Sequence, residues 1–232
     1  MTIYQFEDAD KLGFNPDKVN RLPDFFQSYI DSQRIPGISL LVARDKKIAH
    51  LSHSGTSGIG GGFDIDDETI FRIYSMSKPI TSVALMMLVE QSKVMLQDPI
   101  TKYLPSFKNV KVFESGTPSD YTTREPDRMI TVHDLMTHQS GLTYDFMLEH
   151  PVDALYRNHK INGAHSEKYD LAGLCDALAQ MPLLFSPGDK WNYSVSTDVI
   201  GRIVEIASGQ NFAEFLSDNI FKPLGMVDTS FT

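Results

Sequence analysis

The sequence contains a single cysteine and no long apolar run. One cysteine cannot form an internal disulfide, and Cys175 lies in a helical pattern, so we predict a small core residue rather than a reactive thiol. Nowhere do 18 consecutive apolar residues occur, and the first ten residues lack the basic and apolar regions of a secretory signal. These absences predict no membrane span and a cytoplasmic location.

Basic residues are also fewer than acidic ones. The chain has 21 Lys and Arg residues and 30 Asp and Glu residues, which gives a net charge of −9. No run of Lys or Arg forms the concentrated basic footprint that nucleic-acid binding needs, so nucleic acid is excluded as a partner. With 41% hydrophobic and 22% charged residues, the 232-residue chain has the composition of a globular protein of one or two domains.

Metal-ligand spacing is missing among the seven histidines. His50 and His53 would point to opposite faces of a strand, and His133 and His138 lack the His-Glu-x-x-His frame of a zinc helix. We therefore predict neither a metal nor a cofactor, and expect His138 to order its own turn. The glycine-rich stretch 55–62 lacks the Gly-Lys-Ser/Thr ending of a phosphate-binding loop, so we predict a flexible loop there.

The order of apolar and polar residues predicts strands early in the chain and helices later. Residues 17–32 have helical spacing, and residues 38–43 and 47–51 read as an antiparallel hairpin around a polar turn. A brief extended piece is expected at residues 108–112. Further helices are expected at residues 79–90, 131–141, 169–180 and 196–209, and strands only before Ser75.

Ser75-Met76-Ser77-Lys78 lies where a loop is expected to become the apolar helix that contains Pro79. A lysine three residues after a serine lies one helical turn away on the same face, so it can accept the proton of the hydroxyl and activate it as a nucleophile. Unpaired N–H groups at the start of a helix also favour developing negative charge. The alternative is that Ser75 only caps a core helix.

A second group of polar residues precedes another predicted helix. The turn 186–194 brings Tyr193 and Ser194 to the start of the helix expected at residues 196–209. A phenol beside a lysine ammonium has a lowered pKa and can move a proton between nucleophile and leaving group. The alternative is that Tyr193 is a half-buried aromatic residue with a satisfied hydroxyl.

Together these motifs resemble a known superfamily. Ser75-x-x-Lys78, then the stretch 135–142, then Pro187-Gly188 with Trp191 and Tyr193-Ser194 are similar to the serine β-lactamases and penicillin-binding proteins. The likeness is to the class C branch and its esterase relatives, the family VIII carboxylesterases. It implies an α+β fold, in which an antiparallel sheet flanked by helices joins a mainly helical domain.

The resemblance also implies roles for individual residues. Ser75 would be acylated, Lys78 would accept its proton, and Tyr193 would act as general acid and base. Tyr74, Ser194 and Val195 are expected to bind substrate. The family's Tyr-x-Asn is here Tyr193-Ser194-Val195, so the amide that contacts a β-lactam side chain is absent, which favours an esterase.

The family's third motif, on a strand after the tyrosine, is not found before Thr232. We therefore expect two domains, residues 1–70 and 71–232, with the C-terminal strands absent from this chain. A two-stranded hairpin is marginal by itself, so a C-terminal segment or a second chain would complete the sheet and the oxyanion hole. A homo-oligomer is possible.

Three functions remain open. The first is a serine esterase that cleaves carboxylic esters of small acyl substrates through an acyl-enzyme. The second is a β-lactamase, D-amino-peptidase, amide hydrolase or acyltransferase of the same fold. Such an enzyme would also act on a small ester or amide substrate. The third is a non-catalytic relative that binds a peptide or acts as a scaffold; only an activated hydroxyl would react quickly with a fluorophosphonate.

Overall fold

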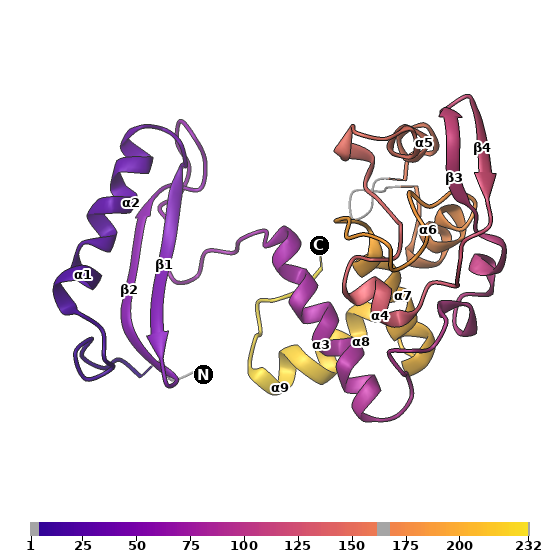
Figure 1. Cartoon of the computed structure of the whole chain (residues 1–232). Coiled ribbons are helices and arrows are strands. Elements are labelled where there is room, and N and C mark those ends of the chain that lie inside the picture. Colours follow the sequence, from indigo (N-terminus) through magenta and orange to yellow (C-terminus); the bar gives the residue numbers. More distant parts are fainter. Residues whose placement is uncertain (1–4, 162–167, 232) are drawn as a thin grey trace. The chain divides into compact units, whose positions relative to one another are not determined.

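The computed structural model describes residues 5–161 and 168–231. The chain divides into two compact units, which we call the hairpin unit, residues 1–72, and the helical unit, residues 73–232 (Figure 1). Each unit is described by itself. In the described parts of the chain, no helix is both long enough and apolar enough to cross a lipid bilayer.

The hairpin unit consists of two helices and one antiparallel hairpin. Its elements are α1 Pro16–Asn20, α2 Leu22–Asp31, β1 Gly37–Arg44 and β2 Lys47–Gly55. The predicted hairpin is confirmed, with Leu41 opposite Leu51. The turn residues Asp45 and Lys46 both have positive φ, of 52° and 62°, the geometry of a turn whose twist matches the strands it joins.

The single helix expected at residues 17–32 is instead two helices, which is a correction to the sequence prediction. α1 ends at Asn20 and α2 begins at Leu22, with Pro23 in its first turn. Proline has no N–H and its ring clashes with the carbonyl of the residue four positions earlier, so a continuous helix through Pro23 is disfavoured. The chain restarts the helix there, because proline is tolerated in a first turn.

The helical unit contains most of the elements. They are the 3₁₀ helices η1 Tyr74–Met76, η2 Ile100–Lys102, η3 Pro105–Asn109 and η4 Asp145–Met147; the α-helices α3 Ser77–Glu90, α4 Val132–Met136, α5 Pro151–His159, α6 Leu171–Leu178, α7 Ser196–Ser208, α8 Phe212–Leu216 and α9 Lys222–Leu224; the π-helix η6 Ser217–Phe221; and the strands β3 Val112–Thr117 and β4 Asp120–Arg124.

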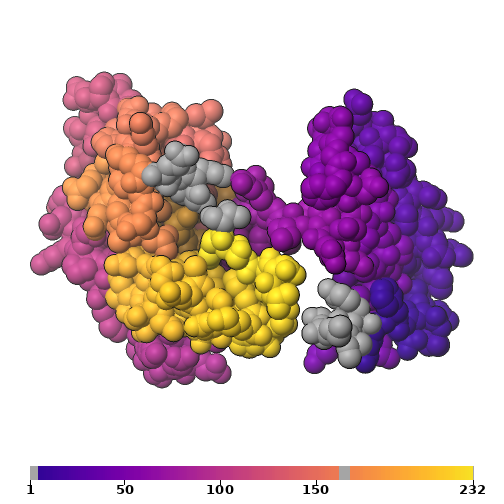
Figure 2. Space-filling view, turned by 180° about the vertical axis from the view of Figure 1, so that it is seen from behind, coloured from indigo at the N-terminus to yellow at the C-terminus, as the bar shows by residue number. Residues whose placement is uncertain are grey.

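Helix α7 lies at the centre of the helical unit. It contacts α3, α4, α6 and α8, and its residues Val199, Ile203 and Val204 are fully buried. Leu85 of α3 and Leu178 of α6 are equally inaccessible in the same core. Helix α7 contacts α8, and on the face shown in Figure 2 the yellow residues late in the sequence lie beside orange residues of the same unit. This core fixes α3 and α7 against each other.

The helical unit contains a hairpin and a helix that the sequence analysis did not predict. Strands β3 and β4 form a second antiparallel hairpin, so the expectation of strands only before Ser75 is wrong. Of β3 only Val112 is buried, and the remaining residues have no alternation of apolar and polar side chains to reveal a strand. Helix α5 was missed as well, although Pro151 at its first position and Asp153 in its first turn are typical start signals.

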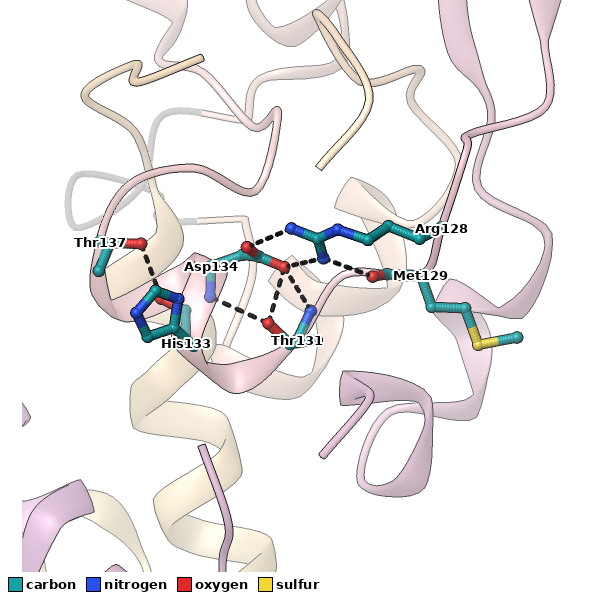
Figure 3. A network of polar contacts seen from close by, with 6 residues as sticks. All are labelled: Arg128, Met129, Thr131, His133, Asp134 and Thr137. Carbon is teal, nitrogen blue, oxygen red and sulfur yellow. Dashed lines mark hydrogen bonds and ion pairs between the residues drawn. The ribbon is translucent and has the colours of Figure 1, made fainter. Parts of the chain in front are cut away.

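The start of α4 is fixed by a polar network around the buried Asp134 (Figure 3). Thr131 caps the helix: its Oγ1 accepts from the N–H of Asp134, whose carboxylate accepts from the N–H of Thr131. The Arg128 guanidinium donates to both Asp134 oxygens, at 2.6 and 2.8 Å. Burial acts to raise the pKa of the Asp134 carboxyl, but the bonds from Arg128 and Thr131 outweigh it and lower the pKa.

Candidate active site

Ser75 lies at the N-terminal end of α3, as the sequence predicts. It is in η1, two residues before the first residue of α3, Ser77, and Pro79 falls in the first turn of α3. Tyr74 has a φ of 44°, a left-handed conformation that is uncommon for a bulky residue and costs on the order of 1 kcal/mol or more. The backbone directly before the candidate nucleophile is therefore strained.

The side chains of Ser75, Lys78 and Tyr193 meet at this position. The Tyr193 hydroxyl is 2.6 Å from Ser75 Oγ, and Lys78 Nζ donates to the same Oγ at 3.3 Å. Lys78 Nζ also lies 4.8 Å from the centroid of the Tyr193 ring. One hydroxyl is thus within hydrogen-bond distance of two groups that can exchange protons with it.

Tyr193 reaches Ser75 because the loop before α7 is tied to the turn after α4. The N–H of Asn192 donates to the His138 carbonyl at 2.9 Å, and the Asn192 side chain donates to the Leu142 carbonyl at 3.0 Å. The His138 ring lies 5.0 Å from the Tyr193 ring, centroid to centroid. His138 itself has a φ of 55°, so the turn that it was expected to order is a tight one.

The side chains of Ser194 and Val195 face the core. Both are fully buried, and neither lines the cavity at Ser75. Ser194 Oγ is 2.8 Å from Ser196 Oγ, which is also 2.8 Å from Ser140 Oγ, so three buried hydroxyls satisfy one another. The structure does not bring the side chains of Ser194 and Val195, which were predicted to bind substrate, to the cavity surface. These side chains support the loop that carries Tyr193.

The electrostatics of the site favour ionisation of Tyr193. Burial acts to raise the pKa of its phenol, but the hydrogen bonds from Lys78 and Ser75 and the charge of Lys78 outweigh burial and lower the pKa. Burial, and then the Lys78 charge, lower the pKa of His138, so its ring favours the neutral form. A neutral histidine does not compete with Lys78 as the cation at this position.

A cavity of about 750 Å³ opens at these residues, within the range of small-molecule sites. Tyr74 lines it, consistent with its predicted contact with substrate. The lining residues are Tyr74, Ser75, Ser77, Lys78, Thr81, Tyr144, Phe146, Asp170, Leu171, Ala172, Tyr193, Thr197, Asp198, Gly201, Arg202, Glu205, Asn211, Phe212, Ala213 and Phe231. In the parts of the chain that the structure describes, no group of three or more His, Cys, Asp or Glu side chains could hold a metal.

Two cavity residues were missed by the sequence reasoning. The Tyr144 ring lies 5.3 Å from the Tyr193 ring, and burial, the Asp198 charge and Tyr193 all raise the pKa of Tyr144. A Tyr144 hydroxyl that stays protonated is a permanent hydrogen-bond donor. Asp198 lies five residues after Tyr193 in the first turn of α7. That spacing was the available signal, but a lone acidic residue in a first turn is typical of any helix.

A serine hydroxyl held between an amine and a phenol, at a helix start and open to a cavity, is the arrangement of a serine-nucleophile active site. The model of the Beta-lactamase family matches residues 22–232. The chain therefore belongs to the beta-lactamase family, whose members similar to this chain include serine hydrolases, and has the β-lactamase/transpeptidase-like α+β fold.

Similar proteins include esterases and acyltransferases. Esterase EstB of Burkholderia gladioli is 33% identical over 225 residues, covering 96% of this chain and 54% of EstB. The structure of EstCE1, a hydrolase with promiscuous acyltransferase activity, has a TM-score of 0.75 at 29% identity, over 89% of this chain and 51% of EstCE1. Simvastatin synthase (LovD) from Aspergillus terreus has a TM-score of 0.70 at 27% identity, over 90% of this chain and 53% of LovD. This chain spans about half the length of these relatives.

Proposed function

We propose that the protein hydrolyses carboxylic esters of small acyl substrates through an acyl-enzyme on Ser75, with Lys78 and Tyr193 as general acid and base. The observation that supports this most directly is the pair of contacts at Ser75 Oγ, 2.6 Å to Tyr193 and 3.3 Å to Lys78. The Ser75 hydroxyl gives up its proton as Oγ attacks the ester carbonyl carbon. The proton then passes to the leaving alkoxide, and water reverses these steps to release the acid.

An ester is favoured over a β-lactam because the loop offers no amide after Tyr193. The family's asparagine position is occupied by Val195, whose side chain is fully buried. A β-lactam side chain would therefore find no hydrogen-bond partner there. Faster turnover of a β-lactam chromophore such as nitrocefin than of p-nitrophenyl esters would contradict this preference.

Acyl transfer to an alcohol is a second candidate, and the comparisons give it specific support. EstCE1, which is similar to this chain, is described as a hydrolase with promiscuous acyltransferase activity. The same Ser75 acyl-enzyme would serve both reactions, because an acceptor alcohol can replace water in the second step. Product analysis with a short-chain ester and an excess of a primary alcohol distinguishes a new ester from the free acid.

Ser75→Ala tests the proposal and should lower kcat/KM for p-nitrophenyl acetate by about 10³-fold or more, because it removes the acylated atom. Thermal unfolding should be unchanged, since Ser75 is exposed. The matched control is Ser82→Ala, the same deletion on α3 at a residue that does not line the cavity. Ester hydrolysis that survives Ser75→Ala, or a wild-type Ser75 that no fluorophosphonate labels, would show that Ser75 is not the nucleophile.

We also propose that further polypeptide, from a C-terminal segment or a second chain, covers apolar surface that the described residues leave exposed. Phe25 and Leu41 in the hairpin unit and Val83 in the helical unit are each more than half exposed, at 56%, 51% and 51%. A two-stranded sheet such as β1–β2 is marginal without further strands or helices. Active, monomeric material with an intact mass of 26.1 kDa would refute this proposal.

A further inference from the structure

The cavity at Ser75 extends along α7, beyond the three side chains proposed to react. Thr197, Gly201 and Glu205 of α7 line it at helical spacing, so they lie on one face of the helix. Because an α-helix rises about 1.5 Å per residue, the stretch from Thr197 to Glu205 spans about 12 Å, close to the length of an extended octanoyl chain. The cavity therefore has room for much more than the ester group that Ser75 would attack.

Apolar side chains from three separate segments wall the cavity around Gly201. Leu171 is the first residue of α6 and Phe212 the first residue of α8, and both line the cavity. The ring of Phe231, which also lines it, lies 5.6 Å from the ring of Phe212, centroid to centroid. A ligand that removes this surface from water gains the free energy of apolar burial.

The polar side chains in this part of the cavity are engaged within the protein. Arg202 donates to Glu205 at 2.7 Å. Asp170 and Asn211 each accept from a backbone N–H in the first turn of the helix that they precede, at 2.7 and 2.9 Å. Burial raises the pKa of Asp198, which favours its neutral carboxyl. An apolar ligand leaves these bonds intact, whereas a polar ligand has to compete with them.

Gly201 lies in the middle of α7, although glycine is a weak helix former. Its φ is not in the left-handed region, so the backbone does not require glycine. A Cβ at this position would meet Phe212 at 3.4 Å and Leu171 at 3.6 Å, which are ordinary contact distances, so close packing does not require glycine either. The effect of the missing side chain is to leave space between Leu171 and Phe212 in the cavity wall.

We propose that this space binds the alkyl part of an unbranched acyl chain of about octanoyl length, and that Gly201 determines which chain length is accepted. The inference rests on the proposed function and names its substrate class. The acyl group stays bonded to Ser75 Oγ after the alcohol has left, so a cavity that is continuous with Ser75 holds the acyl chain through both steps of the reaction.

The first measurement is kcat/KM of the wild type for p-nitrophenyl acetate, butyrate, hexanoate and octanoate. The leaving group is the same throughout, so the series reports on the acyl part alone. Each methylene that moves from water into the apolar space should raise kcat/KM by about threefold. A wild-type kcat/KM that does not rise with acyl length would overturn the proposal.

The second measurement fills the space at Gly201. In Gly201→Leu, the ratio of kcat/KM for the octanoate to that for the acetate should fall by about tenfold or more. Gly201→Ala adds one carbon and should lower the same ratio by about threefold. Alanine is the better helix former, so the thermal unfolding temperature of Gly201→Ala should not fall. A changed ratio in a protein that is not destabilised reports lost space rather than lost fold.

Glu214→Leu is the matched control, because it adds a leucine at an exposed position in the first turn of α8 that does not line the cavity. Its octanoate-to-acetate ratio should equal that of the wild type. If Gly201→Leu does not fold, Ala213→Leu takes its place. Ala213 is exposed and lines the cavity, so a leucine there should lower the ratio in the same direction without a cost to the core.

A parallel series places the chain in the alcohol part, with ethyl acetate and octyl acetate as substrates. If Gly201→Leu impairs octyl acetate and leaves the octanoate-to-acetate ratio at the wild-type value, the space holds the alcohol chain and the proposal is wrong. A wild-type ratio in both series for a folded Gly201→Leu also overturns it and leaves the Ser75 acyl-enzyme intact. A wild type that hydrolyses no ester, and whose Ser75 no fluorophosphonate labels, overturns the proposed function and this acyl site with it.

Discussion

The hairpin unit and the helical unit differ in how much each can bury. Of the described hydrophobic side chains of the hairpin unit, four are buried, Leu12, Val19, Ile48 and Ile65, and each keeps at least 5% of its surface exposed. Helix α2 has no buried residue at all. The helical unit encloses many side chains completely around α7. All three proposed catalytic residues lie in the unit with the closed core, where packing can hold their geometry.

The largest difference between the units should appear when a core side chain is truncated. Ile203→Ala removes a fully buried side chain of α7 and should lower the free energy of unfolding of the helical unit by about 2–5 kcal/mol. Leu41→Ala, the matched truncation in β1 at a 51% exposed residue, should change stability by less than about 0.5 kcal/mol. The contrast is between a closed core and an open sheet.

Trp191 is the single tryptophan of the chain and lies in the helical unit, so its fluorescence during urea unfolding follows that unit alone. Hydrogen exchange of peptides from β1 and β2 follows the hairpin unit. A large loss of stability in Leu41→Ala would mean that its side chain is covered in solution. That result would break the comparison and would support the proposed additional polypeptide.

The sequence predicted the elements whose signal is local. The hairpin β1–β2 follows from apolar residues on either side of the polar turn at Asp45-Lys46, and the helix expected from residue 131 begins directly after Thr131. Hairpin β3–β4 could not be predicted in this way, because most of its side chains are exposed. Its β3 strand contacts α5 and forms a β-bridge from Val112 to Leu183. Alternation along the sequence therefore identified the first hairpin and missed the second, whose strands bury little.

Local and long-range relationships differ in the candidate active site as well. The proximity of Ser75 and Lys78 is a property of helical spacing, whereas Tyr193 lies 118 residues away in sequence and was found through a family resemblance. Ser194 and Val195 were predicted to bind substrate as neighbours of Tyr193. Adjacency in the sequence does not determine which way a side chain points. Ser194 points toward the core, where its hydroxyl is bonded within the buried cluster of serine hydroxyls. Asp198 was missed because its place at the cavity is defined only by the folded structure.

The second largest difference should come from two ion-paired acids that differ in burial, because the Asp134 side chain is 1% exposed and that of Glu7 is 26% exposed, whereas their basic partners are all at least 42% exposed. Asp134, 1% exposed, accepts from Arg128 and caps α4, so Asp134→Ala should lower the stability of the helical unit by about 3 kcal/mol. Glu7 of the hairpin unit pairs with Lys11 and Lys47, whose side chains are 61% and 42% exposed. Glu7→Ala should leave the unfolding of the helical unit unchanged and affect its own unit less, because solvent screens these charges.

The pH dependence of stability tests whether the ionised Asp134 carboxylate stabilises the helical unit. Its pKa is lowered in the folded state, so its stabilisation is complete above the ordinary Asp value of 3.8 and is lost as pH falls through the lower folded pKa. Urea midpoints measured by Trp191 fluorescence between pH 5 and pH 2, about the range in which carboxylates titrate, should therefore fall less steeply in Asp134→Asn. Parallel curves for the two proteins would show that the carboxylate does not stabilise the fold through its charge.

The smallest of these differences should come from two glycines at positive φ, Gly188 of the Tyr193 loop at 93° and Gly60 of the hairpin unit at 87°. A Cβ at Gly188 would lie 2.2 Å from the Arg128 guanidinium, which is held by Asp134, whereas a Cβ at Gly60 meets nothing within 4 Å. Gly60→Ala should cost about 1 kcal/mol of backbone strain, and Gly188→Ala about 2 kcal/mol. Only Gly188→Ala should also lower kcat, because displacement of this loop moves Tyr193 from Ser75. Equal kcat values for the two variants would show that the loop tolerates the displacement, and that the position of Tyr193 depends on the buried serine hydroxyls instead.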